Sequence, residues 1–204
     1  MIIDAHGHYT TAPKQHQAFR EAQLARLADP SLPAPRPAAI SDDAIRESVR
    51  NNQLKLLRER GGDLMLFSPK ASGMEHHVPD PATARAWARA NNDLVHRAVE
   101  LFPRHFAALC QLPQTPGGSL DDATAELRRC VETLGFVGCN LNPDPSGGRW
   151  TDPPLTDKWW YPIYEKMVEL DVPAMVHVSS SCNPNFHATG AHYINADTTA
   201  FMQF

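Results

Sequence analysis

The sequence predicts an α/β fold, a TIM-like (β/α) barrel of which about the first five strand–helix units are present. Three observations lead to this prediction. Short, almost wholly apolar runs alternate with longer segments of helical periodicity, polar residues follow several of these runs, and none is followed by a glycine-rich phosphate loop. Strands of this kind are buried on both faces, which requires parallel pairing with right-handed crossovers. Polar residues gathered at the strand ends favour a barrel over an open doubly wound sheet.

The first apolar run, residues 2–5, is expected to form a buried strand, because it is short and passes directly into the polar triplet His6-Gly7-His8. The segment that follows is polar and contains a cluster of four prolines. It is too long for an ordinary connection in a compact domain. We therefore expect a long loop insertion at about residues 9–40, which covers the mouth of the barrel and contains short helical pieces.

Helices and strands alternate through the rest of the chain. Ser41 can cap a helix that has acidic residues in its first turn and stops at the pair Gly61-Gly62. A later helix is expected to open at Ser119, with Asp122 in the capping-box position. The remaining expected elements are helices at 81–101 and 156–170 and strands at 64–67, 106–112, 136–141 and 172–178.

The number of expected strands falls short of a closed barrel. A complete barrel has eight strands and typically about 250 residues. This chain has 204 residues and five expected strands, and its last residues fall inside an expected helix. We therefore expect residues 1–204 to form a single incomplete barrel domain, the N-terminal part of a longer protein. Expressed alone, it would leave strand edges and apolar faces uncovered and is expected to associate or to pack loosely.

The charge pattern argues against nucleic acid and membranes as partners. The net charge is -4 and the basic residues are scattered, so the sequence has no electrostatic footprint for an anionic polymer or surface. No segment approaches the roughly 20 apolar residues of a membrane span, and the N-terminus has no cationic segment followed by a long apolar one. The four cysteines include no CxxC pair, which is typical of reduced thiols. These features predict a cytoplasmic protein with a small-molecule partner.

Three histidines form the candidate metal site. His6 and His8 lie two residues apart at the end of the first expected strand, so both side chains project to the same side. His177 lies at the carboxyl end of the fifth expected strand, and a barrel would direct it into the same mouth. For an isolated pair of this kind, a hydrogen-bonded turn is the alternative. Three neutral imidazoles suit Zn²⁺ and leave a coordination position for water.

The segment IDAHGH at residues 3–8, the histidine of the fifth expected strand and the strand–helix order are similar to those of the amidohydrolase superfamily. The resemblance covers all 204 residues and points to the branch that contains 2-amino-3-carboxymuconate semialdehyde decarboxylase. It implies a barrel of the metal-dependent hydrolase type that holds Zn²⁺ or another divalent metal. It also implies a histidine after the sixth strand and an acidic residue after the eighth, and neither position lies in these 204 residues.

Three segments resemble the hydratases of this branch that act in protocatechuate degradation, namely HGHYTT (6–11), SPKASGMEHH (68–77) and NLNPD (140–144). This resemblance implies a metal-dependent lyase that adds water to an unsaturated di- or tricarboxylic acid such as 4-oxalomesaconate. One fold and one metal site host many reactions. A nonoxidative decarboxylase, a hydrolase and a noncatalytic truncated chain are therefore the alternatives.

Polar side chains after the second, fourth and fifth expected strands are candidate contacts for a polycarboxylate substrate. A solvated loop or a loop cap is the alternative for each of them. His192 and Tyr193 are candidates for the general acid. The candidate substrate-binding residues are Lys70, Ser72, His76, His77, Asn140, Asn142 and Ser179.

Four aromatic residues fall at helical spacing in the helix before the fifth expected strand: Trp159, Trp160, Tyr161 and Tyr164. We expect them to pack in the core or against another subunit and assign them no chemical role. The second alternative would make the protein a homo-oligomer.

Overall fold

The computed structural model describes residues 1–70 and 77–179. At its centre is a five-stranded parallel sheet whose strands follow one another in sequence order. Sequential parallel strands with helices between them are the pattern of a (β/α) barrel wall. The strands are β1 (Ile3–Tyr9), β2 (Leu64–Pro69), β3 (Phe106–Gln111), β4 (Gly138–Leu141) and β5 (Ala174–Val176).

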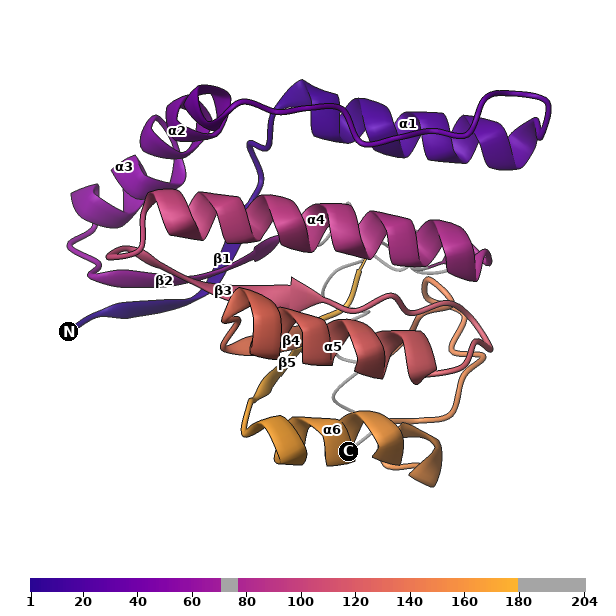
Figure 1. Ribbon diagram of the computed structural model, residues 1–204. Helices are drawn as coiled ribbons and strands as arrows, with labels where there is room; N and C mark the ends of the chain where they lie inside the picture. Colours follow the sequence, from indigo (N-terminus) through magenta and orange to yellow (C-terminus); the bar gives the residue numbers. More distant parts are fainter. Residues whose placement is uncertain (71–76, 180–204) are drawn as a thin grey trace, which may run out of the picture.

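Helices cover the outer face of this sheet (Figure 1). The helices α4, α5 and α6 lie side by side in the order of the strands that they connect, and α1 lies over α4 (Figure 1). The helices are α1 (Lys14–Ala28), α2 (Asp42–Arg50), α3 (Gln53–Glu59), α4 (Pro81–Leu101), α5 (Asp121–Leu134), the short 3-10 helix η2 (Lys158–Trp160) and α6 (Tyr161–Leu170).

The sheet is curled, as the predicted barrel requires. Neighbouring strands lie about 4.7–4.9 Å apart, so the four intervals from β1 to β5 would add up to roughly 19 Å in a flat sheet. Two imidazole side chains cannot span such a gap. Nevertheless, the Nε2 atoms of His8 in β1 and His177 directly after β5 are 3.1 Å apart. The five strands therefore form about half of a barrel wall, and both histidines point to its inner face.

The segment 9–40 differs from the predicted loop with short helical pieces, because it contains one helix of 15 residues, α1. This helix packs on Trp87 of α4. The ring of His16 stacks on the Trp87 ring with centroids 4.5 Å apart, and Phe19 and the buried guanidinium of Arg20 contact the same ring. The docking face of α1 is thus aromatic and polar, and the apolar periodicity of the sequence gave no sign of it.

The single helix predicted from Ser41 to Gly61 is two helices, α2 and α3. The predicted cap is confirmed, since the Ser41 Oγ accepts a hydrogen bond from the backbone N–H of Ala44 at 3.2 Å. The break lies at Asn52, whose Nδ2 donates to the carbonyl oxygen of Ser48 at 2.7 Å. A side-chain amide that bonds to the backbone in this way competes with the helical hydrogen-bond pattern.

The capping box predicted for α5 is wrong. Leu120 is the N-cap residue of this helix and makes no side-chain cap. The Ser119 Oγ accepts from the backbone N–H of Asp121 at 3.1 Å, so its hydroxyl closes a turn one residue before the helix and does not reach Asp122. The helix itself forms where the sequence predicted it.

Apolar side chains fill the space between the sheet and its helices. The rings of Phe67 and Phe106 pack with centroids 4.7 Å apart. Cys110, Cys130 and Cys139 are completely buried here as free thiols, and burial raises the pKa of the Cys110 thiol well above its ordinary value. Cys110 is therefore an uncharged packing residue. Cys110 of β3 and Cys139 of β4 lie side by side in the ladder, so they mark the outer face of both strands.

The aromatic residues near the fifth strand pack largely in the core, as predicted. Trp160 is fully buried and its Nε1 donates to the carbonyl oxygen of Pro153 at 2.9 Å. The hydroxyl of Tyr164 donates to the carbonyl oxygen of Leu155 at 2.6 Å. Tyr161 is 47% exposed and is the member of this group that a subunit contact could use.

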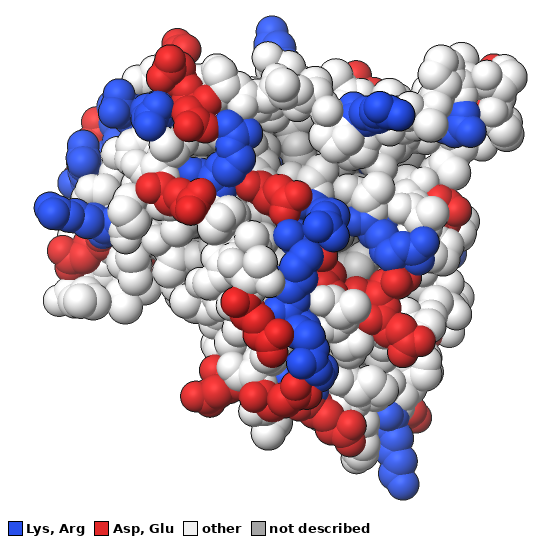
Figure 2. All heavy atoms as spheres, in the orientation of Figure 1, with Lys and Arg blue, Asp and Glu red and all other residues white. Residues whose placement is uncertain are grey.

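Charges of both signs are mixed over the face that Figure 2 shows, with basic and acidic side chains next to each other along the helices. Several of these neighbours are ion pairs, for example Arg129 with Asp93 and Arg128 with Glu169. A mixed surface of this kind does not attract a polyanion over a long range. None of the helices in the described part of the chain has the length and apolar character that crossing a membrane requires.

Candidate metal centre

His6, His8 and His177 come together as predicted, and we call them the histidine cluster. The Nε2 atom of His177 is 2.8 Å from the Nε2 of His6 and 3.1 Å from the Nε2 of His8. The three rings stand nearly perpendicular to one another, with centroids 4.9–5.0 Å apart. Three rings edge to edge around one point present one nitrogen each to that point. Among residues 1–70 and 77–179, this is the one group of three potential metal ligands whose ligand atoms all lie within 4.8 Å of one another.

The backbone of β1 fixes the first two members of the histidine cluster, His6 and His8. The ladder between β1 and β2 has an irregularity between Asp4 and Gly7, after which His8 pairs with Ser68. Gly7 itself lies so close to β2 that an added Cβ would be 2.2 Å from the Cγ of Met65. Only glycine fits between the two histidines, because any side chain would push β1 away from β2.

Hydrogen bonds at the far side of two rings define which nitrogen faces the centre. The Nδ1 of His8 lies 2.9 Å from the carbonyl oxygen of Pro69 and 2.8 Å from the Oγ of Ser68. The Nδ1 of His177 lies 2.7 Å from the carbonyl oxygen of Val178. A carbonyl oxygen only accepts, so each Nδ1 carries the hydrogen and each Nε2 directs its lone pair toward the other rings.

The neutral form of His8 is strongly favoured. Burial lowers the pKa of His8 to about 4, and repulsion from His177 is the next cause. Two neutral rings whose Nε2 lone pairs face each other at 3.1 Å repel unless a cation lies between them. A tetrahedral ion with bonds of about 2.0–2.1 Å needs nitrogens roughly 3.3 Å apart. The cluster therefore fits a divalent metal after the nitrogens move apart by a few tenths of an ångström.

Asn142 and Ser179 have hydrogen-bond partners within the protein. The Nδ2 of Asn142 donates to the Oγ of Ser179 at 3.1 Å, and its Oδ1 accepts from the backbone N–H of Asp144 at 3.1 Å. Gln114 holds the backbone of Asn142 through two hydrogen bonds of 2.8 and 3.0 Å. These bonds match the loop cap that the sequence analysis gave as the alternative.

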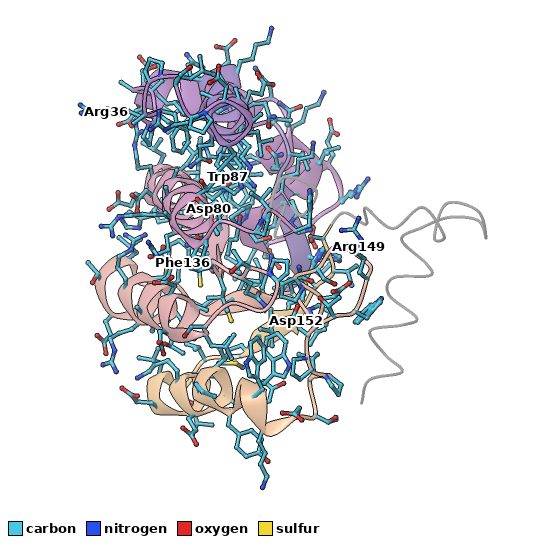
Figure 3. The ribbon with its side chains drawn as sticks, turned by 90° about the vertical axis from the view of Figure 1, so that its right-hand side faces the viewer. Arg36, Asp80, Trp87, Phe136, Arg149 and Asp152 are labelled. Atoms are coloured by element: carbon cyan, nitrogen blue, oxygen red, sulfur yellow. The ribbon has the colours of Figure 1, made fainter. Side chains whose placement is uncertain are left out.

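Asp144 continues this bonded network. Its buried carboxylate accepts hydrogen bonds from the backbone N–H groups of Ser146 and Gly148 and from the Ser146 hydroxyl. We call residues 142–152 the β4 loop. Arg149 and Asp152 of this loop lie at the end of the molecule toward which the strands run (Figure 3).

Asn140 differs from Asn142. It is 1% exposed, and neither its Oδ1 nor its Nδ2 has a hydrogen-bond partner within the described chain. It follows Cys139, which faces outward, so its side chain faces the inside of the barrel wall. A buried carboxamide without partners is costly and points to a ligand or water that completes it.

Lys70 follows β2 and is exposed at the edge of a cavity of about 420 Å³. The cavity lies between α1, α4 and the ends of β1 and β2, with His16, Trp87 and Asn91 in its lining. Trp87 can be seen on α4 below α1 (Figure 3). The side chain of His77 is half-buried. The candidates Ser72, His76, His192 and Tyr193 lie outside the described residues.

The sequence analysis missed two polar residues of the inner face, Ser68 and Gln111. Ser68 ends an apolar run in β2, and its hydroxyl contacts the Nδ1 of His8. Gln111 ends the apolar run of β3 and is 1% exposed. Both carry the signal that had identified Asn140, a polar residue at the end of a buried strand, and could have been found by it.

Comparisons with known proteins agree with this architecture. Over 203 residues the chain is 59% identical to a 2-keto-4-carboxy-3-hexenedioate hydratase of Sphingobium sp. (strain NBRC 103272 / SYK-6), with 100% of this chain and 59% of that protein covered. The crystal structure of a 4-oxalomesaconate hydratase from Rhodopseudomonas palustris is similar with a TM-score of 0.86 and 52% identity, covering 100% of this chain and 57% of that one.

A more distant structure shares the fold. It is a dihydroxybenzoic acid decarboxylase from Polaromonas sp. JS666, solved with bound manganese and an inhibitor, with a TM-score of 0.64 and 21% identity over 99% of this chain and 58% of that one. The chain thus spans less than two thirds of the length of these relatives. Residues 3–204 match the amidohydrolase family. With this match, the half-barrel and the histidine cluster at its mouth, the chain belongs to the amidohydrolase family.

Proposed function

We propose that this chain forms the metal-binding half of a hydratase that adds water to an unsaturated di- or tricarboxylic acid such as 4-oxalomesaconate, in the degradation of aromatic compounds. The observation that carries the proposal is the convergence of three imidazoles, in which the Nε2 of His177 lies 2.8 Å from that of His6 and 3.1 Å from that of His8. The 59% identity to a hydratase over the whole chain supports the reaction class.

We propose Zn²⁺ as the ion, because three neutral imidazoles are a typical zinc ligand set. Manganese in the Polaromonas neighbour makes another divalent ion the alternative. When bound, such an ion supplies Lewis-acid activation of water or of a substrate carbonyl. His6, His8 and His177 would hold it, while Ser68 and the Pro69 carbonyl keep the His8 ring in its orientation.

The proposed substrate carries several carboxylates, and this chain offers polar groups for them. Asn140 presents to the interior a carboxamide that has no partner among residues 1–70 and 77–179, and Lys70 brings a positive charge to the end of β2. Ser72, His76, His77, Asn142 and Ser179 remain candidates for further contacts. His192 or Tyr193 remains the candidate general acid, which would protonate the substrate carbon or oxygen opposite the added hydroxyl.

The setting proposed for the protein follows from the same features. The buried free thiols support a reducing compartment such as the cytoplasm. The exposed ring of Tyr161 is where a contact between subunits of a homo-oligomer would be sought.

Product analysis of the full-length protein tests the reaction. The zinc-loaded protein is incubated with 4-oxalomesaconate, and the product is identified by mass spectrometry in ordinary and in ¹⁸O-labelled water. The expected product has gained one water and carries the label. Release of carbon dioxide without gain of water would identify a decarboxylase instead, which is the activity of the structurally similar Polaromonas enzyme. No turnover by the metal-loaded protein would contradict both.

A further inference from the structure

Gln111 lies at the level of the metal site, although it is far from the histidines in sequence. From strand to strand, the ladder pairs His8 with Ser68, Phe67 with Ala108, Leu109 with Gly138 and Cys139 with Ala174. His8 is therefore in register with position 173 of the fifth segment. However, His8 meets His177, four residues further on. Residues at the same height along the barrel axis are therefore offset from the ladder register by one residue for each strand crossed. An eight-stranded barrel with a shear of about eight has the same offset.

The same offset places Gln111 in the layer of the two histidines. In β3, two strands after β1, the ladder partner of His8 is Leu109, and an offset of two residues makes Gln111 the residue at the height of His8. In barrels of this kind, alternate strands contribute the side chains of one interior layer. His8 of β1, Gln111 of β3 and His177 after β5 thus occupy one layer. Gln111 faces inward because its neighbour Cys110 faces the helices together with Cys139.

The backbone of Gln111 is held rigidly from outside. The Oδ1 of Asn92 in α4 accepts from the N–H of Gln111 at 2.8 Å, and the Nδ2 of Asn92 donates to its carbonyl oxygen at 2.9 Å. The side chain itself is 1% exposed, and its Oε1 has no partner in the residues that the structure describes. Asn140, the ladder partner of Gln111 in β4, is equally buried, and neither its Oδ1 nor its Nδ2 has a partner in the described part of the chain.

We propose that Gln111 and Asn140 form a carboxamide pair that binds one carboxylate of the substrate next to the metal. Two amide N–H groups on adjacent strands can donate to the two oxygens of one carboxylate, and a neutral pair adds no charge that would compete with the metal for the anion. This inference rests on the proposed function for the substrate class. It adds Gln111 as a residue that determines specificity.

The experiment measures the binding of tricarballylate, a saturated tricarboxylate that cannot be hydrated, to the zinc-loaded full-length protein by calorimetry. Zinc content and thermal unfolding are measured on the same samples. Gln111→Met should weaken tricarballylate binding about ten- to hundredfold, since a hydrogen bond to a charged group is lost. Zinc content and Tm should not fall, because the Oε1 of Gln111 accepts no hydrogen bond from the residues that the structure describes. Gln111→Glu should weaken binding further through repulsion of the carboxylate.

Gln114→Met is the matched control, because Gln114 is equally buried and donates to and accepts from the backbone of Asn142. This control should lower the Tm. The proposal is overturned if Gln111→Met binds tricarballylate as the unmodified protein does, or if it unfolds or loses zinc as a structural residue would. Tricarballylate binding that depends on Gln111 in a protein without hydratase activity would keep this inference and remove only the proposed function.

Discussion

The histidine cluster and the β4 loop lie at the same end of the sheet, yet their polar atoms are bonded in different ways. In the β4 loop, Asn142 and the buried carboxylate of Asp144 find their partners within the protein. In the histidine cluster, the Nε2 of His177 lies 2.8 Å from that of His6 and 3.1 Å from that of His8, and the His8 and His177 tautomers turn two lone pairs toward each other. Polar residues at a strand end therefore differ in whether they bond within their own loop or bring their atoms together at one point.

The largest expected effect comes from removing one member of the histidine cluster. In the full-length protein, His177→Ala should reduce zinc affinity by more than about 100-fold and abolish activity, because two imidazoles do not complete a coordination shell. Elemental analysis and a turnover assay measure the two effects together. His96→Ala, which removes an imidazole on α4 that pairs with Glu100, is the control and should leave zinc content unchanged. Retention of zinc by the His177 variant would show that the ion binds elsewhere.

The second effect comes from breaking the hydrogen bonds of the β4 loop. Asp144→Ala should lower the free energy of unfolding by about 2–3 kcal/mol, because buried N–H groups of Ser146 and Gly148 lose their acceptor. Zinc bound per folded protein should stay the same. Urea unfolding followed by fluorescence measures the stability. If zinc were lost while stability did not change, the contrast between the two clusters would be wrong.

A smaller effect tests the hydrogen bond that orients the His8 ring in the histidine cluster. Ser68→Ala removes the hydroxyl that lies 2.8 Å from the Nδ1 of His8, so the ring loses one of its two orienting partners. Zinc affinity should fall by about tenfold, which competition with a chelator would measure. Ser68→Cys, which keeps a weak donor and acceptor, should recover part of the loss. Equal affinity of all three proteins would mean that the Pro69 carbonyl orients the ring by itself.

The smallest effect is a pH dependence of stability that involves His16 of α1 rather than the histidine cluster. Burial lowers the pKa of His16, against the hydrogen bond to Asn91 that raises it. The unfolded chain therefore takes up a proton at this residue at a higher pH than the folded chain, so stability falls as the pH falls below the ordinary histidine pKa of about 6.5. His16→Gln removes this titration and should give a flatter Tm profile between pH 8 and pH 5. An unchanged slope would show that His16 is not linked to folding.

Much of the fold was predictable because local patterns and packing agreed. The strands β2, β3 and β4 were recognisable from their short apolar runs alone. The cap at Ser41 was also recognisable, because it depends on two residues three positions apart. The helix α1 was missed for the opposite reason. Its packing depends on one ring, Trp87, about 70 residues away in sequence, and its own residues show little apolar periodicity.

The sequence by itself indicated the three histidines that come together in the candidate metal centre. The spacing of His6 and His8 puts both side chains on one face of any strand, and the position of His177 after an apolar run puts it at a strand end. Only the tertiary structure decided which other polar residues join them. The curl of the sheet offsets residues at the same height by one residue per strand, which brings Gln111 into the layer of the histidines and leaves Asn142 bonded within its loop. This shear depends on all the strands together, so no local pattern of residues contains it.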